Sequence, residues 1–143
     1  MKRADPRVRG LLERFGVPAE ALAGLDVVEG QGAFFIGTRE VMTFDAVRPL
    51  RRGIRFCRVF PRSVKPTTHA MQVLGRHATR NVIDLEREQV VGLINGEQVE
   101  VDAPAAVEDG YVLLRVDGFS AGVGLYRRPV LKTQLPRYRP VEE

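Results

Sequence analysis

Few side chains in this sequence are of the types that carry out covalent chemistry. The single cysteine, Cys57, lies in an alternating apolar segment, 54–60, that predicts a β-strand. A catalytic thiol needs a neighbouring base or an exposed, electropositive setting, so we expect Cys57 to be a buried core residue. The two histidines, His69 and His77, have no carboxylate or thiol at ligand spacing. The sequence therefore predicts neither a metal site nor a cofactor.

Acids and glycines also form no recognisable catalytic pattern. The acids concentrate between Asp84 and Asp117, without the His, Lys or Ser partners that acid–base or nucleophilic catalysis needs. Gly118, Gly122 and Gly124 lie between predicted strands and lack the Lys-Ser/Thr pair of a phosphate-binding loop. We therefore expect a chain without catalysis of its own.

The distribution of charge points instead to the binding of a polyanion. Residues 46–83 hold nine basic residues and no acid, residues 84–118 hold nine acids and two arginines, and residues 119–141 hold five basic residues and no acid. The planar guanidinium of arginine suits bidentate phosphate contacts and stacking on bases. Genome composition alone would explain the abundance of arginine but not the segregation of sign. We predict that the two basic segments converge on one face, with the acids mainly opposite.

Composition and length set limits on the fold and the location. A chain of 143 residues suffices for one domain of usual size or for two small ones. Apolar residues at 44% and charged residues at 28% are typical of a globular protein in water, and no apolar run approaches the ~18–20 residues of a membrane span. The N-terminus lacks a signal-peptide pattern, so we expect a cytoplasmic protein without a membrane partner.

The elements that would position the charges are short. Asp5-Pro6 ahead of apolar residues at helical spacing predicts a helix that ends at Gly16, and the β-rich runs 25–29 and 33–37 around Gly-Gln-Gly predict a hairpin. A basic loop is expected at 62–66. Further strands are predicted at 54–60, 81–85, 98–101, 111–116, 119–126 and 130–131, with helices at 67–74 and 86–94. Short strands with two short helices predict a small mixed barrel.

The strand 119–126 carries glycine at two alternate positions, Gly122 and Gly124. Because alternate residues of a strand share a face, one face of this strand is bare backbone at two consecutive sites. We expect another group to pack closely there, or a ligand to bind there.

The order of features in the last third of the chain resembles a known domain. Gly110 before a strand, the turn at Gly118, the glycine pair, Lys132 and the ending Pro136-Arg137 resemble the PUA-like RNA-binding domain at the C-terminus of the Sun family of RNA cytosine-5 methyltransferases. Upstream, Lys65-Pro66-Thr67-Thr68-His69-Ala70 is similar to the family's Pro-Ser-His-Ala segment, and Ile94-Asn95-Gly96-Glu97 to its Gly-Glu turn. The resemblance implies an α+β fold, with a PUA-like domain at 53–143 after a small pre-PUA-like α/β module at 1–52.

The resemblance also implies a function. PUA domains grip structured RNA by shape and backbone in a groove beside one helix and the glycine-bearing strand, so we expect a non-catalytic protein that binds rRNA or tRNA in RNA modification or ribosome assembly. The family's methyltransferase domain, with its paired cysteines, is not recognised in this chain. The alternative is an interaction subunit that docks on a separate RNA methyltransferase without contacting RNA. The candidate RNA-binding residues are Arg62, Lys65, Arg76, Arg80, Gly122, Gly124, Arg127, Arg128, Lys132 and Arg137.

Overall fold

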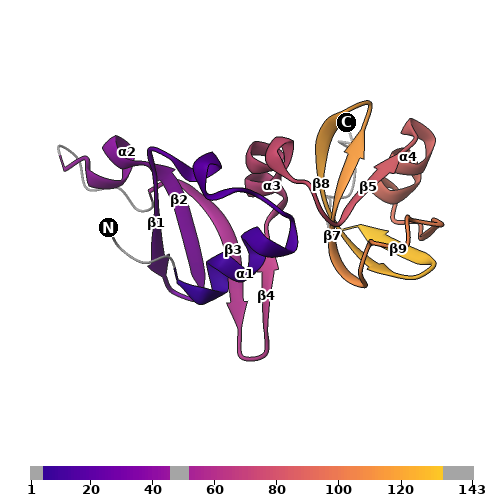
Figure 1. The fold of residues 1–143 in the computed structure, drawn as a ribbon, viewed down its shortest axis with the longest axis horizontal. Helices are drawn as coiled ribbons and strands as arrows, with labels where there is room; N and C mark the ends of the chain where they lie inside the picture. The colour runs from indigo at the N-terminus through magenta and orange to yellow at the C-terminus, as the bar shows by residue number, and fades with distance from the viewer. Residues whose placement is uncertain (1–4, 46–51, 134–143) are drawn as a thin grey trace, which may run out of the picture.

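A computed structural model describes residues 5–45 and 52–133, which form two sheets joined through helix α3 (Figure 1). In chain order the elements are α1 (Pro6–Arg14), η1 (Ala19–Leu22), β1 (Leu25–Gly30), β2 (Ala33–Thr38), α2 (Arg39–Thr43), β3 (Ile54–Phe60), β4 (Ser63–Pro66), α3 (Thr68–Leu74), η2 (Gly75–His77), β5 (Val82–Leu85), α4 (Arg87–Ile94), β6 (Val99–Glu100), β7 (Gly110–Val116), β8 (Phe119–Arg127) and β9 (Val130–Thr133). In these two ranges no helix is long and apolar enough to cross a membrane. Arg48, Arg51, Pro136, Arg137 and Arg139 lie outside the described residues.

The N-terminal elements follow their local sequence signals. The side chain of Asp5 caps α1 by accepting a hydrogen bond from the backbone N–H of Arg7 at 2.9 Å. Hydrogen bonds from Arg7 also lower the pKa of Asp5 to about 2. Gly16 adopts a φ of 60° after the helix, which favours glycine. Strands β1 and β2 pair as the predicted antiparallel hairpin.

The first sheet has the order β1-β2-β3-β4 and is antiparallel throughout. Strand β3 was expected to open the barrel and is instead a central strand of this sheet, because Cys57 and Val59 complete the apolar core beneath α1. The segment expected as a basic loop at 62–66 is also different, since β4 pairs residue by residue with β3 from Cys57 opposite Pro66 to Phe60 opposite Ser63. The first sheet thus extends beyond residue 52, and the division there stays a prediction.

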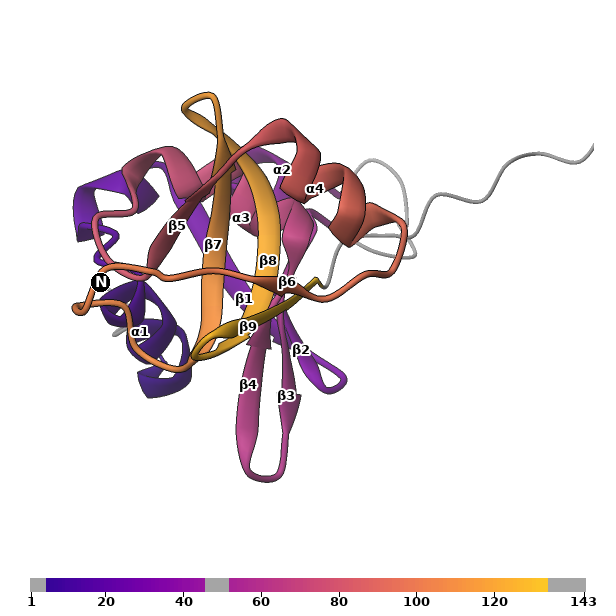
Figure 2. The same cartoon turned by 90° about the vertical axis from the view of Figure 1, so that its right-hand side faces the viewer.

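The second sheet has the order β5-β7-β8-β9-β6 and curls into a half-barrel (Figure 2). Strands β5 and β7 are parallel, and the other pairs are antiparallel. Val112, Leu114, Tyr126 and Leu131 fill the inside of the curl together with Leu93 of α4. The α+β class predicted from the sequence is confirmed, and the predicted small mixed barrel is present as this curled half-barrel.

Helix α3 lies between the two sheets and packs against both β3 and β8 (Figure 1). Successive residues of β7 serve different cores, because side chains alternate across a strand. Val112 and Leu114 point into the half-barrel, whereas Leu113 joins Met71 of α3 in the core shared with the first sheet. The second sheet is therefore buried on both faces where α3 packs on it. Away from α3, its outer face carries exposed residues such as Arg127 and Lys132.

Candidate nucleic-acid interface

The structure brings Arg127 and Lys132 together on the outer face of the second sheet. Lys132 lies opposite Leu125 in the β8–β9 pair, and Arg127 lies two residues further along β8 on the same face. Diagonal neighbours of this kind have Cα atoms about 7–8 Å apart. Both residues are exposed, and neither makes an ion pair with any described residue. Such a pair of cations can contact the phosphates of one backbone.

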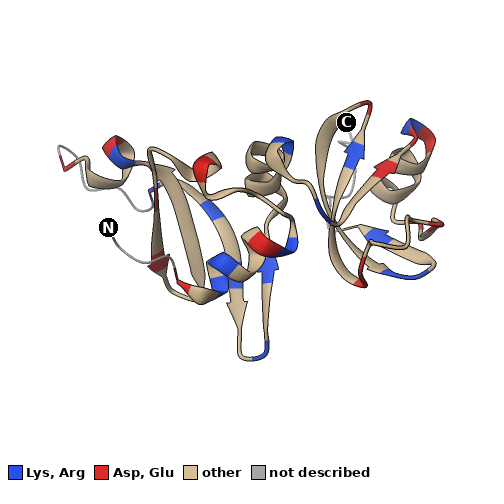
Figure 3. Ribbon diagram, in the orientation of Figure 1, with Lys and Arg blue, Asp and Glu red and all other residues tan. Residues whose placement is uncertain are grey.

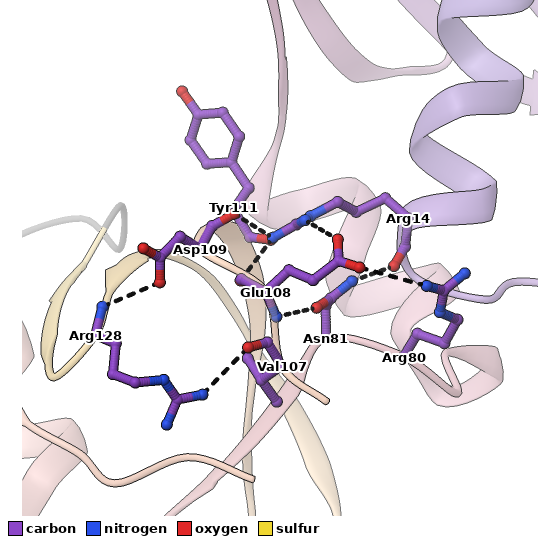
Figure 4. Close-up of polar contacts among 8 residues, drawn as sticks. All are labelled: Arg14, Arg80, Asn81, Val107, Glu108, Asp109, Tyr111 and Arg128. Carbon is purple, nitrogen blue, oxygen red and sulfur yellow. Dashed lines mark hydrogen bonds and ion pairs between the residues drawn. The ribbon is translucent and has the colours of Figure 1, made fainter. Parts of the chain in front are cut away.

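Arg128, the neighbour of Arg127, makes contacts within the protein that Arg127 does not make. Its guanidinium donates hydrogen bonds to three backbone carbonyls of the loop 101–109: Ala103 at 2.7 Å, Pro104 at 3.1 Å and Val107 at 3.2 Å. Figure 4 shows the bond to Val107. It also lies over the ring of Tyr126, at 5.4 Å from the ring centroid. Three of its five N–H donors are thus already used within the protein. Arg128 anchors the loop, and its assignment as an RNA-binding residue stays a prediction.

A second polar cluster, missed by the sequence reasoning, joins α1 to the second sheet (Figure 4). Buried Asn81 donates from Nδ2 to the carbonyl of Arg14 at 2.6 Å and accepts at Oδ1 from the backbone N–H of Glu108 at 2.9 Å. The guanidinium of Arg14 in turn donates to the carbonyls of Glu108, Asp109 and Tyr111. The cluster fixes the loop 101–109 against the N-terminal helix.

Two predicted RNA-binding residues of the basic segment 46–83, Arg80 and Arg76, lie apart from each other and from the Arg127–Lys132 pair. Arg80 forms an ion pair with Glu108 at 3.7 Å, beside the cluster around Asn81. Arg76 donates from Nε to Nε2 of His77 at 3.1 Å, in the turn η2. That turn contacts β8 at its beginning, near Ser120, whereas Arg127 ends the same strand. Arg76 therefore lies far along β8 from the Arg127–Lys132 pair.

Arg62 and Lys65 lie on the β3–β4 hairpin of the first sheet. Arg62 is exposed in the turn after β3, and Lys65 of β4 is paired across the strands with Arg58 of β3. None of these three cations forms an ion pair within the described part of the chain. Figure 3 shows the hairpin marked by basic residues alone. The basic residues thus form at least two surfaces, and the last predicted cation, Arg137, lies outside the described residues.

The separation of charge seen in the sequence is not kept in the fold. Parallel pairing sets Asp84 of β5 opposite Arg115 of β7, with Nε and Oδ1 2.7 Å apart. Hydrogen bonds from Arg115 lower the pKa of Asp84. Arg87 pairs with Asp117 at 2.6 Å, and Glu108 contacts Arg14 and Arg80. The expectation that the acids would lie mainly opposite the basic residues is therefore wrong for these acids. Strand pairing brings Asp84 to Arg115, and the packing of α4, α1 and the loop 101–109 brings the others to arginines.

Gly122 and Gly124 face the inside of the half-barrel and are buried. A Cβ atom on Gly124 would lie 2.9 Å from Cδ1 of Leu131, 3.0 Å from the carbonyl oxygen of Lys132 and 3.1 Å from Cδ2 of Leu114. The bare face is thus filled by side chains of the same domain. Gly122 has a φ of 152° next to a bulge in the β7–β8 pair. Of the two roles considered for Gly124, the structure supports close packing.

The single cysteine considered for covalent chemistry lies in the core. Cys57 is fully buried, and its burial raises the pKa of the thiol to about 11. A thiol that is protonated and shielded from solvent is a poor nucleophile. No group of three His, Cys, Asp or Glu residues in the described ranges could hold a metal ion.

Comparison with known protein families gives one match. Residues 80–139 match the family model of the PUA domain of methyltransferase RsmF. No curated protein matches the chain. The matched range includes all five strands of the second sheet, so the resemblance to the C-terminal PUA domain of the Sun family is confirmed for this sheet. A PUA domain is an RNA-binding module without catalysis of its own.

Proposed function

We propose that this protein binds structured rRNA or tRNA in RNA modification or ribosome assembly. The proposal starts from the match of the second sheet to the PUA domain of methyltransferase RsmF. The observation that carries the proposal is the Arg127–Lys132 pair, two exposed cations on one face of β8 and β9. Phosphate contacts from such residues position an RNA without reading its sequence. We also propose that the protein acts in the cytoplasm.

The contrast between Arg127 and Arg128 supports the choice of surface. A phosphate that approached Arg128 would compete with three loop carbonyls, so part of the binding energy would be lost in breaking those hydrogen bonds. Arg127 and Lys132 have no such partners to give up among the described residues. Their charges are available to a polyanion at no internal cost.

Docking on a separate RNA methyltransferase is a second candidate function. Glu88 of α4 is an exposed acid without an ion pair in the described residues, and it could meet a basic partner. Glu86 is unsuitable as a probe of this surface, because its side chain and that of Gln89 form the capping box of α4.

A pair of charge-reversal variants separates the two functions. Binding of tRNA and rRNA fragments is measured by titration for Arg127→Glu with Lys132→Glu, and for Glu88→Lys. Loss of two phosphate contacts should weaken binding to all RNA sequences and flatten the slope of log affinity against log salt by about two units. The acidic variant should bind RNA as well as the parent or slightly better. If the basic variant binds RNA like the parent, while the acidic variant loses a methyltransferase partner, the docking function holds instead.

A further inference from the structure

One face of the first sheet is not covered by any helix or strand of residues 5–45 and 52–133. Alternation along the strands sends Val27, Ile36 and Cys57 towards the core, and the other set of residues to the opposite face. Antiparallel sheets commonly expose such a face, and then it is usually polar. Here it carries Val28 and Phe60, each 47% exposed, and Phe35 between them in the sheet. An exposed face with two phenylalanines is unusual and indicates a contact surface.

Basic residues are interleaved with these aromatic residues. Arg55 lies opposite Phe35 in the β2–β3 pair, with its guanidinium 5.9 Å from the centroid of the ring. Arg58 and Lys65 lie opposite each other on β3 and β4, and Phe60 follows Arg58 by two residues on the same face. Along the strands Phe35 and Phe60 are roughly 14 Å apart at ~3.4 Å per residue, with Arg58 and Lys65 between them.

These cations lack acidic partners. Arg55, Arg58 and Lys65 form no ion pair within residues 5–45 and 52–133, and the buried Nε of Arg55 has no hydrogen-bond partner. The strand register places one acid on this face, Asp26 of β1, which is paired with Arg39 at 3.8 Å. The surface is therefore positive around its aromatic rings, and its charge complements a polyanion.

We infer that the outer face of the first sheet binds a single-stranded segment of RNA. Bases would stack on Phe35 and Phe60, while Arg58 and Lys65 contact the phosphates between them. Stacking on aromatic rings beside a basic track is the general chemistry by which proteins hold unpaired nucleic acid. This inference rests on the proposed RNA binding and adds a second surface to it, so that the PUA domain holds a structured part and the first sheet an adjoining unpaired strand.

The test compares an unstructured probe with a structured one. The full chain is titrated at low salt with a fluorescein-labelled ten-nucleotide oligouridylate and with tRNA. Phe60→Ala should weaken oligouridylate binding at least about five-fold, the lower range for loss of one stacked base. Phe119→Ala removes a phenylalanine that is 75% exposed in the β7–β8 turn, and it should leave binding unchanged. Arg58→Ala should weaken binding, whereas Arg9→Ala, which removes an exposed arginine of α1, should not.

Several outcomes would overturn the inference, and they differ from failure of the proposed function. If oligouridylate does not bind, while tRNA binds and its binding depends on Arg127 and Lys132, then the first sheet is not an RNA-binding surface. The proposal for the PUA domain would still hold. Equal affinities for Phe60→Ala and Phe119→Ala would also rule out the surface on the first sheet. Equal binding of polyglutamate and oligouridylate, both reduced by Arg58→Ala, assigns the face to an acidic protein segment. If ultraviolet irradiation of the complex crosslinks uridine to Phe35 or Phe60, the inference is supported directly.

Discussion

Replacement of Arg128 by alanine tests whether this residue serves the fold rather than RNA. The change removes the hydrogen bonds to the carbonyls of Ala103, Pro104 and Val107 and the contact with the ring of Tyr126. A hydrogen bond from a charged donor contributes ~1.5–3 kcal/mol, but the Arg128 side chain is 38% exposed, and water can replace part of what is lost. We expect a loss of ~2–3 kcal/mol in the free energy of unfolding. For a domain of this size that corresponds to a fall in Tm of roughly 6–12 °C.

Arg127→Ala is the matched control, because the two arginines are neighbours of the same charge. Arg127 is exposed and has no ion pair in the described part of the chain, so its loss should change stability by no more than ~0.5 kcal/mol. Thermal unfolding followed by circular dichroism measures both variants, and RNA titration below both melting temperatures should show the opposite order. The assignment of Arg128 to the loop would be refuted if the two variants melted alike.

Three further predictions concern the interior. Gly124→Val should destabilise the protein by ~1–3 kcal/mol in chemical unfolding, because the carbonyl of Lys132 cannot yield to a Cβ 3.0 Å away; an unchanged midpoint would show that the half-barrel can expand there. Asn81→Ala should cost ~2–3 kcal/mol through the loss of two buried hydrogen bonds, and amide exchange of Glu108 should speed up. The thiol of Cys57 should react with Ellman's reagent at pH 8 only after unfolding. Because the folded state raises the pKa of this thiol from 9.0 to about 11, stability should also fall as pH rises between these values.

Local signals in the sequence predicted most of the elements. The cap at Asp5 and the glycines of the first hairpin act within a few positions of the chain, and each element begins or ends close to where they indicate. The assignment of β3 to the barrel failed because alternation shows that a strand exists but not which strand it pairs with. The pairing of β3 with β2 depends on tertiary packing, because residues of β3 join the core beneath α1.

The site was only partly predictable for the same reason. Arg127 and Arg128 are indistinguishable in sequence, and only the fold shows that the loop carbonyls point at the second of them. The residue type of Asn81 was one signal, because asparagine tolerates a positive φ. The structure shows this residue at a φ of 54°. Arg14 offered none, because its partners are carbonyls of Glu108, Asp109 and Tyr111, far along the chain. The pairing of Asp84 with Arg115 follows from strand register, which charge counting along the chain does not contain.

The salt dependence of RNA binding tests the central claim most directly. A fragment of rRNA and a tRNA are titrated with the protein over a range of salt concentrations, and log affinity is plotted against log salt. Neutralised phosphates release counterions, so a module that makes about four to six phosphate contacts should show a slope of roughly −3 to −5. The account predicts such a slope for both RNAs, reduced by about two units when Arg127 and Lys132 are replaced together. The absence of affinity for either RNA at low salt would contradict it.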